Sequence, residues 1–152
     1  KQITPTLEKN NNQDLNFKRV ISEETSRKLK KILRKVVTDE KGTASLANIY
    51  GYDVSGKTGT SQYYDNKNKN INSFISFFNV SNKNYILLVM LDNPQVAKNL
   101  IYNYRGLKVK GTRNEAGWNA VYTAGRIIEK IGPILAINNK EIPTQHVIKK
   151  TN

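Results

Sequence analysis

The pattern of hydrophobic and polar positions predicts a first helix near the start of the chain. Ser22 is a residue type that caps helix N-termini, and Glu23 and Glu24 follow it in the first turn, where acidic groups are favourable. Apolar residues then recur at helical spacing, at Leu29, Ile32, Leu33, Val36 and Val37. The pattern predicts an amphipathic helix of about 16 residues that ends near Gly42, with Lys and Arg on its other faces.

Three strands are predicted to follow this helix. Residues 54–62 are placed on a strand although they contain two glycines, because glycine in a strand often marks the close approach of a ligand or another backbone. Residues 73–80 and 85–91 are predicted to form an antiparallel hairpin, closed by the four polar residues 81–84. Both hairpin strands are apolar at successive positions, so we expect them to be central and covered on both faces, with part of the covering core outside this chain.

The remaining segments are predicted from weaker patterns. Residues 43–52 suggest a short helical turn, residues 63–72 a polar loop and residues 95–117 a long basic loop. A second helical face then begins at Trp118. It continues through Val121, Tyr122, Gly125, Ile128 and Ile131. We expect the Gly132-Pro133 pair to close or kink this helix.

This order of elements predicts an α+β fold, with an antiparallel sheet flanked by helices. We expect an irregular segment over residues 1–19, the folded part over residues 20–138 and a polar tail over residues 139–152. The chain does not begin with Met, and its start lacks the apolar core of a signal peptide, so the N-terminus is expected to be missing.

Composition narrows the classes of function. The chain has 152 residues and a mean hydropathy of -0.61. It has no apolar run of the roughly 18 residues that would indicate a membrane span. Without cysteine, and with His146 as its single histidine, it offers no thiol chemistry and argues against a His-based triad or metal site. The net charge of +13 is spread over helix faces and loops without interleaved aromatics, so we expect no nucleic-acid partner. We also expect no metal and no cofactor.

The most distinctive chemistry lies in Ser55 to Gln62, which reads Ser-Gly-Lys-Thr-Gly-Thr-Ser-Gln. Lys57 supplies a cation, Thr58 and Thr60 supply hydroxyls, and Gly59 lies between the two threonines. On a strand that faces a cleft, these groups would bind an anion or stabilise an oxyanion.

A phosphate-binding loop is an alternative interpretation of the same stretch, because residues 51–58 match G-x-x-x-x-G-K-[ST] and Asp92 follows an apolar strand. A phosphate loop needs a buried strand before it and a helix that starts at Lys57-Thr58. The residues after Thr58 favour a strand, and the next predicted unit is a hairpin. A nucleotide-binding protein is therefore the less favoured interpretation.

The Lys57-Thr58-Gly59-Thr60 stretch resembles the K-T-G signature of penicillin-binding proteins. The surrounding residues resemble class B enzymes in order and spacing over about residues 15–138, and the last helix is similar to the cell-division type. The residues that carry the resemblance are Val20-Ile21-Ser22, Val36-Val37, Gly42-Thr43-Ala44, Ala47, Gly51-Tyr52, Ser55 to Gln62, Ser73-Phe74-Ile75, Leu91 to Gln95, Trp118-Asn119-Ala120, Gly125 to Ile128 and Ile131-Gly132-Pro133.

The resemblance implies the C-terminal part of a serine β-lactamase / D,D-transpeptidase fold, with peptidoglycan stem peptides as substrate and β-lactam antibiotics as inhibitors. It implies catalytic roles for Lys57 and Thr60 and substrate binding by Thr58, Gly59 and Thr60, with the Thr60 N–H as an oxyanion donor. It also implies cell-division membrane proteins as partners and a place on the periplasmic face of the bacterial inner membrane, with the anchor outside this chain.

The sequence departs from the family pattern in one respect. The family carries Ser-x-x-Lys and Ser-x-Asn before Lys-Thr-Gly, and neither motif occurs anywhere in this sequence. We therefore expect the chain to be a portion of a transpeptidase domain that is inactive alone. The alternative is a non-catalytic remnant that binds stem peptide or a division partner.

Overall fold

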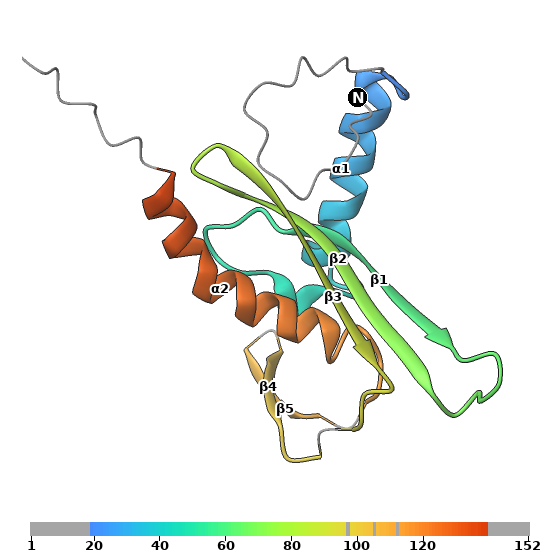
Figure 1. The fold of residues 1–152 in the computed structure, drawn as a ribbon. Coiled ribbons are helices and arrows are strands. Elements are labelled where there is room, and N and C mark those ends of the chain that lie inside the picture. The colour runs from blue at the N-terminus through green and yellow to red at the C-terminus, as the bar shows by residue number, and fades with distance from the viewer. Residues whose placement is uncertain (1–18, 97, 105, 112, 140–152) are drawn as a thin grey trace, which may run out of the picture.

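The structure, a computed structural model, describes residues 19–139 except residues 97, 105 and 112. The predicted irregular N-terminal segment and polar tail therefore lie almost entirely outside the described residues, as does His146. The described elements are two α-helices, one 3-10 turn, a three-stranded sheet and a separate two-stranded hairpin (Figure 1).

Helix α1 spans Glu23–Thr38 and confirms the first predicted helix. The Ser22 side chain accepts a hydrogen bond from the Thr25 N–H at 3.0 Å, which satisfies one of the free amides at the helix start. Its apolar stripe is only partly covered, because Val37 is buried whereas Leu29 and Ile32 are exposed. The 3-10 turn η1 (Ser45–Ala47) confirms the short helical turn and places Ala47 in the core.

The main sheet consists of β1 (Ser55–Gln62), β2 (Asn70–Val80) and β3 (Lys83–Asp92), in the order β1-β2-β3 with both pairs antiparallel. All three predicted strands are confirmed. The predicted four-residue turn is wrong, because Lys83 pairs with Val80 and leaves only Ser81 and Asn82 between the strands. Both have positive φ, at 49° and 64°, as the tightest hairpin turns require. Strand β2 also begins at Asn70, so the preceding polar loop is shorter than predicted.

One face of the sheet builds the core. Phe74, Phe78 and Val89 are buried on this face, and α2 packs against them. Phe78 lies edge-on to Tyr52 at 6.4 Å and stacks on Tyr85 at 5.7 Å between ring centroids. This aromatic group closes the end of the core nearest the β2–β3 turn.

The opposite face of the sheet is open among the described residues. Its side chains keep large exposed fractions: Ile75 52%, Ile86 78%, Leu88 54% and Met90 60%. The described part of the chain therefore leaves this face largely uncovered, and its covering by segments outside this chain stays a prediction. The strands are apolar on both faces; α2 packs on one of them through β2 and β3, whereas α1 contacts β1 at the edge of the sheet.

Helix α2 spans Ala120–Asn138, and the Asn119 side chain caps it by accepting from the Ala120 N–H at 2.6 Å. The expectation that Gly132-Pro133 closes or kinks the helix is wrong as to closure, since Pro133 lies inside it, and a kink stays a prediction. Gly125 lets the helix approach η1, because a Cβ there would lie 2.7 Å from the Leu46 carbonyl oxygen. At the far end, Asn139 accepts from the Tyr85 hydroxyl at 2.9 Å and donates to the Val80 carbonyl at 3.2 Å.

The predicted basic loop contains a second hairpin, β4 (Ile101–Tyr104) with β5 (Leu107–Lys110), that the sequence pattern did not reveal. Figure 1 shows it beneath α2 and apart from the main sheet. Tyr102 is buried and holds it in place, with edge-on ring contacts to Trp118 at 5.4 Å and Tyr122 at 4.9 Å. None of the described helices is long and apolar enough to cross a membrane.

Candidate functional site

Strand β1 carries the Lys-Thr-Gly-Thr stretch at the edge of the sheet. Within the described part of the chain it pairs only with β2, so its other edge is free. The strand starts buried, at Ser55 and Gly56, and becomes exposed toward Gln62. A free edge offers backbone N–H and C=O groups to an extended peptide, which is the geometry needed to add a strand.

Strand alternation divides the polar side chains of β1 between the two faces of the sheet. Lys57 lies opposite Ile75, on the open apolar face, whereas Thr58 and Thr60 lie opposite Phe74 and Asn72 on the packed face. The structure therefore does not point the three side chains into one cavity. They meet only along the free edge of β1, where a ligand could reach both faces.

The Lys57 side chain is exposed and lines a cavity of about 910 Å³. The cavity lies between α1 and the open face of the sheet, and most of its lining surface is apolar. Other lining residues include Lys30, Lys31, Leu33, Ile75 and Ile86. The Lys57 ammonium donates to the Thr58 carbonyl at 2.7 Å, a contact that an anionic ligand could displace.

The two threonine hydroxyls lie in a second, smaller and more polar cavity of about 420 Å³. Thr58 and Thr43 share a hydrogen bond of 3.0 Å between their hydroxyls. Thr60 accepts a hydrogen bond from the Ala116 N–H at 3.4 Å. Further lining residues are Lys41, Ser45, Tyr104, Arg113, Glu115, Gly117 and Trp118. Arg113 lies 5.5 Å from the centre of the Trp118 ring, which gives this cavity a cationic rim.

Gly59 lies in β1 opposite Ser73. A Cβ at this position would lie 2.7 Å from the Ser73 hydroxyl oxygen, so the absence of a side chain allows β1 and β2 to pair closely here. The role of Gly59 toward a substrate, like that of the Thr60 N–H as an oxyanion donor, stays a prediction.

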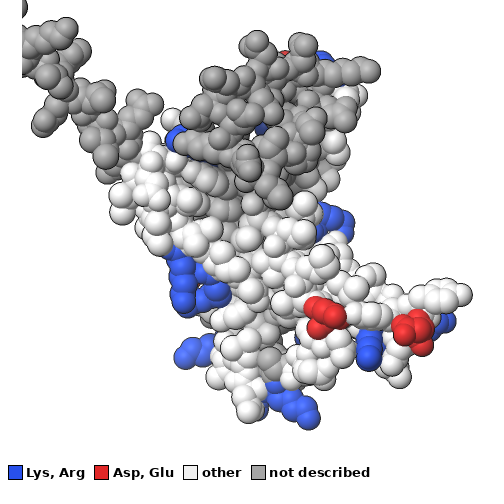
Figure 2. Space-filling view, in the orientation of Figure 1, with Lys and Arg blue, Asp and Glu red and all other residues white. Residues whose placement is uncertain are grey.

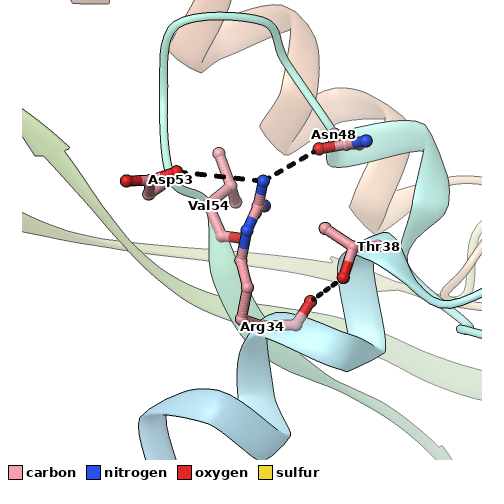
Figure 3. Close-up of polar contacts among 5 residues, drawn as sticks. All are labelled: Arg34, Thr38, Asn48, Asp53 and Val54. Atoms are coloured by element: carbon pink, nitrogen blue, oxygen red, sulfur yellow. Dashed lines mark hydrogen bonds and ion pairs between the residues drawn. The ribbon is translucent and has the colours of Figure 1, made fainter.

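Arg34 of α1 holds the start of β1 (Figure 3). Its guanidinium donates to the Val54 carbonyl at 2.5 Å and to the Asn48 side chain at 3.2 Å, and lies 4.0 Å from the Asp53 carboxylate. The carbonyl of Arg34 in turn accepts from the Thr38 hydroxyl at 3.1 Å. One charged side chain thus joins α1, the segment after η1 and the residue that precedes β1, three positions before Lys57.

Sequence reasoning missed Arg34, Thr43, Asn114 and Ala116 as neighbours of the site. Arg34 was assigned to a solvated helix face with five other basic residues, and nothing in the pattern separates it from them. Thr43 precedes a short turn, and its contact with Thr58 depends on how that turn folds back. Asn114 and Ala116 lie in the segment that was predicted as a loop.

The structure does not match a phosphate-binding loop. Lys57 and Thr58 lie in the middle of a strand, and an antiparallel strand follows, where a helix would have to begin. Asp92 ends β3 and accepts a hydrogen bond from the Tyr63 hydroxyl, which raises the pKa of Tyr63. Residues 19–139, with the three gaps noted, hold no cluster of three His, Cys, Asp or Glu that could bind a metal.

Charge gives no sign of a nucleic-acid surface on the visible face. In Figure 2 the Lys and Arg side chains are separated from one another across that face, and much of the surface between them is uncharged. Along the sequence, six Lys and Arg residues lie on α1, at positions 27, 28, 30, 31, 34 and 35.

Residues 1–113 match the family described as penicillin binding protein transpeptidase domain. The chain belongs to this family. The α+β fold of antiparallel sheets with flanking helices is that of a transpeptidase domain, and the resemblance based on Lys57 to Thr60 is confirmed at the level of the family. The boundaries of the predicted segments stay predictions.

Several curated relatives of this chain are named as peptidoglycan D,D-transpeptidases. The chain is 34% identical over 134 residues to the probable peptidoglycan D,D-transpeptidase FtsI of Caulobacter vibrioides, covering 81% of this chain and 21% of that protein. It is 40% identical over 82 residues to stage V sporulation protein D of Bacillus subtilis, covering 51% of this chain and 12% of that protein. The matched part thus spans about a fifth of the length of the first relative and a smaller share of the second.

A solved structure supports the same assignment. The transpeptidase domain of the FtsI4 D,D-transpeptidase from Legionella pneumophila superposes with a TM-score of 0.51 at 26% identity. The match covers 73% of this chain and 37% of that domain. The chain therefore corresponds to part of a penicillin-binding transpeptidase domain.

Proposed function

We propose that this chain supplies the Lys-Thr-Gly-Thr strand of a peptidoglycan D,D-transpeptidase that cross-links stem peptides during cell-wall synthesis and division. The observation that supports the proposal most strongly is β1 itself. It is an edge strand with a free side, and it places a lysine and two threonine hydroxyls along that edge. A family member that binds an extended peptide by strand addition needs this arrangement.

The reaction is an acyl transfer. A serine oxygen attacks the carbonyl carbon of the penultimate D-Ala, the amide bond to the terminal D-Ala breaks, and the leaving amine takes up a proton. An amine from a neighbouring stem peptide then attacks the acyl-serine ester, releases the serine hydroxyl and forms the cross-link. β-Lactams acylate the same serine and block it.

Lys57 and Thr60 would take the catalytic roles on this strand. The Lys57 ammonium supplies positive potential on the open face, where it can stabilise developing negative charge and assist proton movement at the serine. The backbone N–H of Thr60 would be one of two oxyanion donors, and loss of one such donor typically costs about 10²–10³ in rate.

Thr58 and Thr60 would bind the substrate carboxylate through their hydroxyls, beside Gly59. Hydrogen bonds to a carboxylate are stronger than those between neutral groups. The two side chains leave the same face of β1 and both line the 420 Å³ cavity, so they can act on one anion at the strand edge.

The serine and its base must come from outside this sequence, because neither Ser-x-x-Lys nor Ser-x-Asn occurs in it. The open apolar face beside Lys57 supports this assignment, because a catalytic segment that docked there would cover Ile75, Ile86 and Leu88 and approach the ammonium. We infer that the chain is inactive alone. In the complete protein it would lie on the periplasmic face of the inner membrane and work with other cell-division membrane proteins.

The proposal is tested by extending the coding sequence in frame before residue 1 and producing the encoded protein. We expect a Ser-x-x-Lys and a Ser-x-Asn in the added part, covalent labelling by a fluorescent penicillin, and loss of labelling after treatment with unlabelled β-lactam. The 152-residue chain alone should not be labelled. Absence of these motifs and of labelling, together with binding of a D-Ala-D-Ala pentapeptide, would instead indicate a non-catalytic relative.

A further inference from the structure

Three asparagine side chains form an amide cluster beside Thr60. The central member is Asn114, whose side-chain oxygen accepts from Asn72 Nδ2 at 3.1 Å and from Asn119 Nδ2 at 3.2 Å. Its own Nδ2 donates to the Pro94 carbonyl at 2.6 Å. These three bonds fix one orientation of the Asn114 amide, because its oxygen must face two donors and its nitrogen an acceptor.

The cluster joins four separate parts of the fold. Asn72 lies in the central strand β2, Pro94 follows β3, and Asn119 caps α2. Asn114 lies in the segment before α2, and this segment reaches the site. Two residues after Asn114, the Ala116 N–H donates to the Thr60 hydroxyl oxygen at 3.4 Å. The cluster therefore determines where the Ala116 N–H stands relative to β1.

The contact between Ala116 and Thr60 affects the direction in which the Thr60 hydroxyl can donate a hydrogen bond. A threonine hydroxyl has one proton and two lone pairs. When the Ala116 N–H occupies one lone pair on the packed side, the hydroxyl proton remains available to donate at the exposed strand edge. A carboxylate, which can only accept, is the kind of ligand that this orientation suits.

Asn72 bears a cost that structural packing alone does not explain. It is fully buried, and its Oδ1 has no hydrogen-bond partner among the described residues. An unsatisfied buried acceptor costs roughly 1–3 kcal/mol, which offsets the gain from the bond that the Asn72 Nδ2 donates to Asn114. Asn72 is also the register partner of Thr60, so its side chain lies on the same face, next to the hydroxyl.

We propose that Asn72 and Asn114 are positioning residues for the proposed reaction: they hold the Ala116 N–H on Thr60 and so direct the Thr60 hydroxyl toward the carboxylate of the stem peptide or β-lactam. This assignment rests on the proposed function. It adds two specificity-determining residues that lie on β2 and before α2, outside the Lys-Thr-Gly-Thr strand.

The test uses the complete transpeptidase that contains this chain and measures the rate of acylation by two penicillins. One penicillin carries its free carboxylate, and the other is its methyl ester. Asn72→Leu should lower acylation by the free acid about threefold to tenfold, the range that one hydrogen bond accounts for, and acylation by the ester less than about twofold. Asn114→Leu should behave alike. Asn79→Leu, at the other end of β2, is the matched control and should change neither rate.

A second comparison separates positioning from general damage. In a Thr60→Val background, Asn72→Leu should cause no further loss, because the hydroxyl through which it acts is absent. The unfolding temperature of each variant shows that it is folded, and Asn72→Ala removes the same donor if the leucine variant does not fold. Equal losses with both penicillins, or the same loss in the Thr60→Val background, would overturn the assignment while the proposed function stands. A wild-type protein that is not acylated would overturn both.

Discussion

The two faces of the β1-β2-β3 sheet differ in how completely they are built. One face buries Phe74, Phe78 and Val89 under α2. The other leaves Ile86 and Leu88 largely exposed, although both faces carry side chains of similar hydrophobicity. Composition alone would not distinguish the faces, so the difference lies in what packs on each of them.

The same division runs through the candidate site. Thr58 and Thr60 belong to the packed face and already have hydrogen-bond partners, Thr43 and Ala116, from the chain itself. Lys57 belongs to the open face, and its ammonium donates a hydrogen bond to the carbonyl of the next residue, Thr58. The threonine side of the site is thus assembled by this chain. Under the proposed function, the lysine side would be completed by a part of the transpeptidase domain outside this chain.

The largest expected effect comes from truncating matched apolar residues on the two faces. Phe74→Ala should lower the free energy of unfolding by about 3–5 kcal/mol, because it leaves a cavity in the core. Ile86→Ala should change it by less than about 0.5 kcal/mol, since that side chain is already in water. Urea unfolding of the 152-residue chain measures both. Similar losses for the two variants would show that the open face is covered in solution.

A smaller effect is expected at the link between α1 and β1. Arg34→Met should cost about 1–3 kcal/mol, because the Val54 carbonyl and the Asn48 side chain lose a charged donor. Arg27→Met removes the same charge from an exposed position of the same helix and is the control. Thermal unfolding of the two variants gives the comparison. If they lose the same stability, the contacts drawn in Figure 3 contribute nothing.

A change of charge on the open face should affect association more than stability. Leu88→Lys should leave the free energy of unfolding of the isolated chain within about 0.5 kcal/mol of its original value. It should also reduce self-association, because it interrupts an exposed apolar surface. Sedimentation velocity at several concentrations tests this expectation. Unchanged association would mean that the chain does not self-associate through this face.

The smallest expected effect is a dependence on alkaline pH in the β4–β5 hairpin. Burial raises the pKa of Tyr102, and the neighbouring Tyr122 adds to the rise. The folded state therefore holds the Tyr102 proton more tightly than the unfolded state, whose pKa is about 10. The resulting stability is present below that pH and is lost as the pH rises through the raised value.

Tyr102→Phe should therefore reduce the loss of stability above pH 10, relative to the exposed control Tyr50→Phe, in unfolding curves collected across that range. The pKa of Tyr63 is raised as well, but Tyr63 is present in both variants, so its contribution cancels from the difference. Identical pH profiles for the two variants would contradict the role assigned to Tyr102.

The sequence predicted the elements with strong periodicity and missed what depends on contacts between distant segments. Helix α1, strand β1 and the β2–β3 pair follow from local spacing and from the cap at Ser22. Hairpin β4–β5 was missed because its strands have four residues each and mix Tyr, Asn and Lys. Its position depends on Tyr102 packing against Trp118, which no local pattern encodes.

The candidate site was predicted to a similar extent. Lys57, Thr58, Gly59 and Thr60 were located by their motif, but their division between two faces follows only from the register of β1 against β2. The hydrogen bonds made by Arg34, Thr43 and Asn114 join residues that are 14 to 42 positions apart in the sequence, so local spacing could not predict them. Apolar strands on both faces indicate burial without showing which segment provides it, so the covering of the open face stays a prediction.

The most direct test of the account is fluorescent-penicillin labelling of the complete protein with Lys57→Ala. We predict a loss of acylation rate of about 10²–10³, as for removal of one group that stabilises the transition state, with an unchanged unfolding temperature. Lys69→Ala, in the loop after β1, should be labelled normally. Normal labelling of the Lys57→Ala protein would contradict the claim that β1 lines the acyl-transfer site.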